Sequence, residues 1–286
     1  MQLESAFPIL AKPPIAASMD RVKLRVLVAD TSEEIRRRCK DDLVAADPSI
    51  TILEAVDGPS ALDVLKRESI DLCLIDRTLP RVDGQLLVQQ VQQPHRRTVF
   101  VLLSDKLVSS WPEIASQVRA YEVLLKPPGK ARVDKLLGVL QKMKTPARVL
   151  IALENPASAA VVIRMFDAAR FTLVPDIVER AEVLLRRIEQ SYDFVLLDMT
   201  LPDMTGIEVA ARIRERDPRL GIIMTGRGAF PAESFLRQLG VSAYLRQPFD
   251  TLALENALHK VFGLWQPYLQ SALMRSRARA SSRGTP

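Results

Sequence analysis

One arrangement of residues occurs twice in this chain, at an interval of 121 or 122 positions. The interval separates three pairs of identical or chemically similar residues: Asp76 and Asp198, Gly84 and Gly206, and Ser104 and Thr225. A repeat of this length corresponds to a duplicated domain rather than to a small stacking unit. The 286 residues leave room for two domains of ordinary size. We therefore predict two tandem copies of one fold.

Short apolar runs alternate with helix-like stretches in both halves of the chain. The runs lie at residues 24–29, 70–75, 99–103 and 121–125, and again at 149–152, 192–197, 222–224 and 243–245. Runs this short and this apolar are typical of parallel strands buried on both faces. The alternation predicts an α/β fold in each half, with helices on both faces of a parallel sheet.

The repeat also sets the expected domain boundaries. We expect a disordered leader over residues 1–22, a first domain over 23–144, a second domain over 146–263, and a helical extension with a basic disordered tail over 264–286. Met19 stands just before the first predicted strand, so the sequence leaves open whether Met1 or Met19 is the start. The tail supplies four of the six net positive charges: Arg275, Arg277, Arg279 and Arg283.

Polar residues follow the predicted strands of the first half. They are Asp30, Asp76, Ser104 and Lys126. In an open parallel sheet, functional residues gather at the carboxyl ends of the strands. Two carboxylates suit Mg²⁺, and a carboxylate can accept a phosphoryl group. A lysine and a hydroxyl can then hold the phosphoryl oxygens. Each residue taken alone reads as a polar group at a strand end, but the four in this order favour a site.

Two segments carry a resemblance to a known family. Residues 71–84 read DLCLIDRTLPRVDG and residues 192–206 read YDFVLLDMTLPDMTG. Both resemble the phosphorylation segment of bacterial response-regulator receiver domains, which are CheY-like. The resemblance implies two flavodoxin-like domains, each with a five-stranded sheet in the order 2-1-3-4-5. It also implies that a histidine kinase or a phosphotransfer protein supplies a phosphoryl group.

The resemblance implies a role for each matching residue. Asp76 and Asp198 would accept the phosphoryl group, and Ser104 and Thr225 would be the switch hydroxyls. Lys126 would contact the phosphoryl oxygens. The metal ligands would be Asp30 and Asp76 in the first copy, and Glu154 and Asp198 in the second.

Both copies depart from the family pattern. The first has Thr31 in place of a second acid, and Val123 where the family tends to have an aromatic residue. The second keeps Tyr244 at that position but has Gln247 where the lysine should stand. Each copy also lacks one acid, so we expect weak Mg²⁺ binding. We expect the first copy to be the better phosphoryl acceptor and the second to be a docking or dimerisation surface.

No recognisable output module follows the second copy, so we expect the signal to pass by protein–protein binding, with homodimerisation as one form of it. Two alternatives stay open: a phosphorylation-independent adaptor, and a nucleic-acid binder acting through the arginine-rich tail. Enzymes on similar folds fit less well. A flavodoxin needs a phosphate loop where the acidic residues 30–34 stand, and an aspartate-nucleophile phosphatase needs an acid where Thr78 and Thr200 stand.

The remaining signals are structural. Cys39 and Cys73 lack any metal-site or disulfide spacing, so we read them as buried residues in a reducing cytoplasm. His95 and His259 are read as surface residues. No apolar run reaches the roughly 18 residues that suggest a membrane span, so we predict no membrane insertion. The sequence does not identify the kinase, the partner or the pathway.

Overall fold

A computed structural model describes residues 23–91, 97–106, 120–227 and 233–267. The chain divides into two compact units, one built mainly on Arg21–Thr145 and the other on Pro146–Ala168 and Thr172–Leu264. We call them the first and the second domain. The predicted leader and most of the predicted tail lie outside the described residues.

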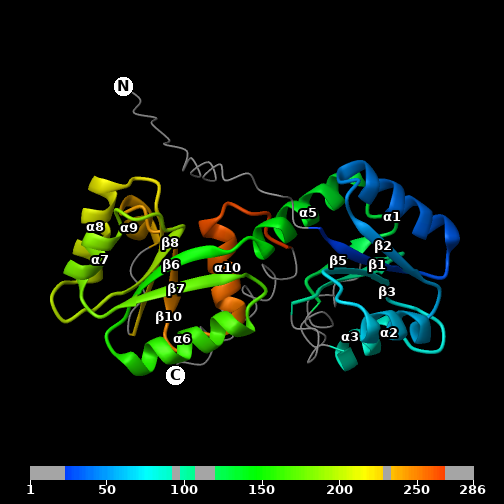
Figure 1. Ribbon diagram of the computed structural model, residues 1–286, viewed down its shortest axis with the longest axis horizontal. Helices are drawn as coiled ribbons and strands as arrows, with labels where there is room; N and C mark the ends of the chain where they lie inside the picture. Colours follow the sequence, from blue (N-terminus) through cyan, green and yellow to red (C-terminus); the bar gives the residue numbers. More distant parts are fainter. Residues whose placement is uncertain (1–22, 92–96, 107–119, 228–232, 268–286) are drawn as a thin grey trace, which may run out of the picture. The chain divides into compact units, whose positions relative to one another are not determined.

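The first domain contains a five-stranded parallel sheet in the order β2-β1-β3-β4-β5. Its described elements are β1 (Arg25–Ala29), α1 (Glu33–Ala46), β2 (Thr51–Ala55), α2 (Gly58–Arg67), β3 (Leu72–Asp76), α3 (Gly84–Val91), β4 (Val99–Ser104), β5 (Glu122–Leu125) and α5 (Lys130–Lys144). Helices α1 and α5 cover one face of the sheet, and α2 and α3 cover the other (Figure 1). The predicted fold class and strand order are confirmed.

The second domain repeats this topology. Its described elements are β6 (Ala147–Ala152), α6 (Pro156–Ala168), β7 (Leu173–Val178), α7 (Ala181–Arg187), β8 (Phe194–Asp198), α8 (Gly206–Arg216), β9 (Gly221–Gly226), α9 (Glu233–Gln238), β10 (Ala243–Arg246) and α10 (Thr251–Val261). The sheet runs β7-β6-β8-β9-β10, again parallel throughout. Numbered within the domain, this is once more the order 2-1-3-4-5.

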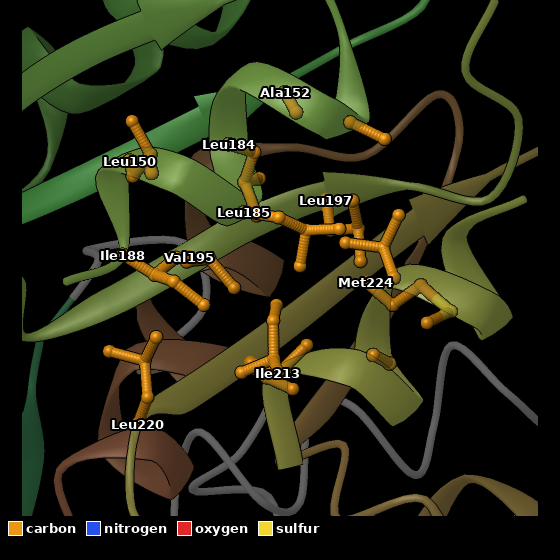
Figure 2. Close-up of a cluster of buried hydrophobic side chains, with 14 of the residues drawn as sticks. Leu150, Ala152, Leu184, Leu185, Ile188, Val195, Leu197, Ile213, Leu220 and Met224 are labelled. Atoms are coloured by element: carbon orange, nitrogen blue, oxygen red, sulfur yellow. The ribbon is translucent and has the colours of Figure 1, made fainter. Parts of the chain in front are cut away.

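The cores explain why the strands read as apolar runs. Every residue of β3, β4, β8 and β9 is buried. Successive strand residues point to opposite faces, so a strand covered by helices on both sides has no exposed face. Figure 2 shows one such layer of the second domain, between the sheet and the helices packed on it: Leu150, Ala152, Leu184, Leu185, Ile188, Val195, Leu197, Ile213, Leu220 and Met224. Burial on both faces therefore accounts for the apolar runs of the sequence.

The smaller sequence predictions have mixed outcomes. Cys39 and Cys73 are buried free cysteines, as expected. The reading of His259 as a surface residue is wrong, because its side chain is fully buried on α10, with Nδ1 2.7 Å from the carbonyl oxygen of Glu255. His95 lies outside the described residues. Over the described ranges, the helices are too short or too polar to cross a membrane.

Candidate functional site

Three predicted site residues of the first domain meet at the carboxyl edge of its sheet. Asp30 follows β1, Asp76 ends β3 and Lys126 follows β5. The ammonium nitrogen of Lys126 lies 2.9 Å from Oδ2 of Asp30 and 2.8 Å from Oδ2 of Asp76. The Lys126 side chain is only 8% exposed. Burial alone would lower the pKa of Lys126, but its hydrogen bonds to Asp76 and Asp30 outweigh that effect and raise the pKa. The ammonium group therefore stays charged between two acids.

The second oxygen of each carboxylate is held by the chain that follows its strand. Oδ1 of Asp30 accepts a hydrogen bond from the backbone N–H of Ser32 at 2.8 Å. Oδ1 of Asp76 accepts bonds from the backbone N–H of Thr78 at 3.0 Å and from its hydroxyl at 3.2 Å. Each acid thus has one oxygen fixed by the backbone and one turned toward the Lys126 ammonium.

A glycine beside each acceptor aspartate lets the following helix start close to it. A Cβ atom on Gly84 would stand 2.0 Å from the carbonyl oxygen of Asp76, and one on Gly206 would stand 2.3 Å from that of Asp198. Both distances are impossible for real side chains, so only glycine fits. The glycine of the recognised segment is therefore explained by backbone contact with the acceptor residue.

The structure corrects the predicted match between Ser104 and Thr225. In the second domain Thr225 lies directly opposite Asp198 in the β8–β9 pairing. In the first domain Leu103, not Ser104, lies opposite Asp76 in the β3–β4 pairing. The Ser104 hydroxyl donates to the carbonyl oxygen of Lys106 at 2.8 Å. One residue of difference places a strand side chain on the other face, so Ser104 does not take the position of Thr225.

In the second domain Asp198 and Thr225 lie close together, but the side chain that contacts the aspartate is Gln247 and not a lysine. The side-chain amide nitrogen of Gln247 lies 3.4 Å from Oδ2 of Asp198 and 3.2 Å from the Thr225 hydroxyl. Gln247 and Lys126 both precede a cis proline. The side-chain oxygen of Gln247 accepts a bond from Nε of Arg227 at 3.2 Å. An amide therefore stands where the first domain has an ammonium group.

The charge balance of the second site follows from this replacement. Burial raises the pKa of Asp198, and the negative charge of Glu154 adds to the rise. Hydrogen bonds from the backbone N–H groups of Glu154 and Thr200 and from the Gln247 amide act in the opposite direction without cancelling it. Burial and then the charge of Asp198 also raise the pKa of Tyr244. The Asp198 carboxylate thus lies beside an uncharged amide, whereas Asp76 lies beside the ammonium group of Lys126.

The acids of the first site fit a hard divalent cation only in part. Asp30 and Asp76 turn oxygens to one point, which suits Mg²⁺. Within the described ranges no three His, Cys, Asp or Glu side chains form a metal-binding group. Asp30 and Asp76 could therefore supply only part of a shell, and Lys126 competes for the same oxygens. In the second domain, Glu154 is exposed.

Arg227 is the residue of this region that the sequence reasoning missed. Arg227 stands two residues after Thr225, at the end of β9, and reaches the Gln247 side chain. An arginine directly beyond a strand that carries a site residue was the available signal.

Comparison with known proteins identifies the family. The model of the response regulator receiver domain matches residues 26–137 and 149–259. The chain belongs to the response-regulator receiver family. Both receiver domains are of the kind that acts in two-component signalling. Receiver domains are generally not enzymes, although some similar proteins are methylesterases.

Individual relatives resemble this response regulator over parts of its length. The chemotaxis protein CheY of Bacillus subtilis is 27% identical over 118 residues, which cover 41% of this chain and 95% of that protein. A protein-glutamate methylesterase/protein-glutamine glutaminase of Methanospirillum hungatei is 32% identical over 122 residues, which cover 41% of this chain but 35% of the relative. The chain thus spans about a third of the length of that relative, and it likewise matches 28% and 37% of two others.

A solved structure supports the tandem arrangement of the fold. A two-component system response regulator/GGDEF domain protein superposes with a TM-score of 0.56 at 18% identity, covering 85% of this chain and 99% of that one. At this identity the likeness concerns the fold alone. It extends over both receiver domains of the present chain.

Proposed function

We propose that this response regulator accepts a phosphoryl group on Asp76 and passes the signal on by binding another protein. The contact of Lys126 with both Asp30 and Asp76 is the observation that carries this proposal. It supplies a buried, charged lysine beside a nucleophilic carboxylate, which is the pairing that phosphoryl transfer needs. The proposed receiver domains span residues 23–144 and 146–263.

The chemistry follows from the positions of these groups. An oxygen of Asp76 attacks the phosphorus of a phosphohistidine on a kinase or phosphotransfer protein. The P–N bond breaks, its electron pair stays on the imidazole nitrogen, and an acyl phosphate forms on Asp76. The Lys126 ammonium, already 2.8 Å from Oδ2, pairs with the new phosphoryl oxygens. A Mg²⁺ ion held by Asp30 and Asp76 would further neutralise their charge. The acyl phosphate carries about two negative charges at neutral pH, in place of the single negative charge of the Asp76 carboxylate.

The second domain is proposed as the weaker acceptor. Gln247 cannot supply a positive charge to a phosphoryl group on Asp198, and burial already disfavours the charged form of that aspartate. This favours the adaptor reading for the second domain, as a surface for docking or for a second copy of the chain. For the first domain, the charge of Lys126 favours a role as phosphoryl acceptor over a role as adaptor.

The test is phosphoryl incorporation from a small-molecule phosphodonor with Mg²⁺, measured by intact mass on the full chain. Wild type should gain a phosphoryl group, and Asp76→Asn should lose it. Asp105→Asn is the matched control, because Asp105 also lies near Lys126, at 3.9 Å, but its side chain is 76% exposed. Undiminished incorporation in Asp76→Asn would overturn the assignment of Asp76 as the acceptor. An equal loss of incorporation in Asp76→Asn and Asp105→Asn would also overturn it.

A further inference from the structure

The two domains differ in what joins the acceptor aspartate to the neighbouring strand. In the first domain Lys126 contacts Asp30 and Asp76, while Leu103 faces Asp76 across the β3–β4 pairing. In the second domain Gln247 contacts both Asp198 and the hydroxyl of Thr225. The aspartate and the β9 hydroxyl are thus bridged by the side chain of Gln247.

Each polar group in this bridge is satisfied. The Thr225 hydroxyl donates to the carbonyl oxygen of Leu245 at 2.9 Å, which leaves its lone pairs free to accept from the Gln247 amide. The Gln247 side-chain oxygen accepts from Arg227, and the Gln247 backbone N–H donates to the carbonyl oxygen of Gly226 at 2.9 Å. Thr225 is fully buried. The contacts of Gln247 with Asp198 and Thr225 are partly buried, whereas the contact of Arg227 with Gln247 is exposed. Hydrogen bonds that are shielded from water hold their groups in place more strongly than exposed ones.

The end of β9 is packed closely around the bridge. A Cβ atom on Gly226 would lie 2.8 Å from the Tyr244 hydroxyl and 2.8 Å from Cγ of Met199. Tyr244, on the neighbouring strand β10, and Met199, directly after the neighbouring strand β8, therefore both pack against the end of β9. This packing leaves little room for the ends of β9 and β10 to move past each other.

We propose that Gln247 is a positioning residue that locks the ends of β9 and β10 in one arrangement without phosphorylation, and that Arg227 holds Gln247 in place. The second domain then presents a constant surface, whatever the state of Asp76. This goes beyond the proposed function of the first domain and does not depend on it. The lock rests on the contacts among the Asp198, Thr225, Gln247 and Arg227 side chains, none of which belongs to the first domain.

Hydrogen–deuterium exchange on the full chain tests the lock. Gln247→Ala should speed exchange in residues 222–227 and 243–247 by about tenfold, and Arg227→Ala by less, because one net hydrogen bond is worth about twofold to tenfold in an opening equilibrium. Arg246→Ala is the matched control, an exposed arginine next to Gln247. Unchanged exchange in Gln247→Ala, or an equal effect of Arg246→Ala, would overturn the proposal.

A second arm separates the lock from the phosphorylation of Asp76. Wild type treated with phosphodonor and Mg²⁺ should show unchanged exchange in residues 222–227 and 243–247. In an Asp76→Asn background, Gln247→Lys should raise phosphoryl incorporation on Asp198 about tenfold or more, the size of one charge-assisted contact. Phosphodonor-induced exchange in the wild-type segments would contradict the lock, as would efficient labelling of Asp198 beside the native Gln247. Failure of Asp76 labelling would instead affect only the proposed function.

Discussion

At the scale of single residues, the two domains differ in one side chain that follows the last strand of each sheet. Lys126 brings a charge to two acids, whereas Gln247 brings an amide to an acid and a hydroxyl. The sequence alone predicted this replacement, because the residue before the proline can be read directly. Side-chain contacts such as Arg227 with Gln247 depend on packing and were not predictable.

Lys126→Ala should slow phosphoryl incorporation on Asp76 by about tenfold or more, because a buried charge-assisted contact to the phosphoryl oxygens is lost. Initial rates by intact mass measure this. Lys130→Ala is the control, since Lys130 forms an exposed pair with Asp134 at 2.8 Å. Equal rates in wild type and Lys126→Ala would show that Lys126 does not assist phosphoryl transfer to Asp76.

The raised pKa of Asp198 predicts a pH-dependent gain from Asp198→Asn. Burial raises the pKa of Asp198 in the folded state above the ordinary 3.8. The contribution of protonated Asp198 to the free energy of unfolding is therefore complete below pH 3.8, and it is lost as the pH rises through the higher folded-state pKa. The neutral asparagine avoids that loss. The unfolding midpoint of the second domain should therefore rise relative to wild type at pH 7, with a smaller difference at pH 4. Circular dichroism melts at both pH values test this, and a larger benefit at pH 4 would contradict it.

At the scale of elements, the loop after each acceptor strand is fixed to the preceding helix by a pair of opposite charge. In the first domain Asp57, the N-cap of α2, lies 3.0 Å from Arg81 on the loop. In the second domain the acid is on the loop instead. Asp203 accepts the Ala181 backbone N–H at 2.9 Å and lies 3.6 Å from Arg180, the N-cap of α7. The contact is kept while its charges are exchanged.

Gly84→Ala should destabilise the first domain and lower phosphoryl incorporation, because its Cβ would collide with the Asp76 backbone. Gly138→Ala is the matched control. Gly138 lies inside α5, nothing lies within 4 Å of its Cβ position, and alanine there should stabilise by about 0.5–1 kcal/mol. Thermal unfolding and intact mass on both variants measure the contrast. A Gly84→Ala variant as stable and as active as Gly138→Ala would refute the contact argument.

Elements were also the scale at which the sequence predicted most. Strands buried on both faces appear as apolar runs, and these runs predicted four of the five strands in each domain. The edge strands β2 and β7 are partly exposed and form no such run, so the number of five and the strand order came from the family resemblance. The register of β4 could not be, because in the run Leu102-Leu103-Ser104 either of the last two residues could lie opposite Asp76. A one-residue shift exchanges the two faces of a strand. The pairing of Leu103 with Asp76 therefore required the structure.

At the scale of the whole molecule, duplication has kept one fold and divided its chemistry. The first domain has the lysine but Leu103 and Val123 at the positions of Thr225 and Tyr244. The second has the hydroxyl and the aromatic ring but lacks the lysine. We propose that the chain carries one working phosphoryl acceptor, Asp76, beside a receiver domain whose site is held by its own side chains.

The most direct test is to count phosphoryl groups per chain by intact mass after saturation with a phosphodonor and Mg²⁺. We expect one group on wild type, one on Asp198→Asn and none on Asp76→Asn. Two groups on wild type, or one group remaining on Asp76→Asn and lost on Asp198→Asn, would contradict this proposal.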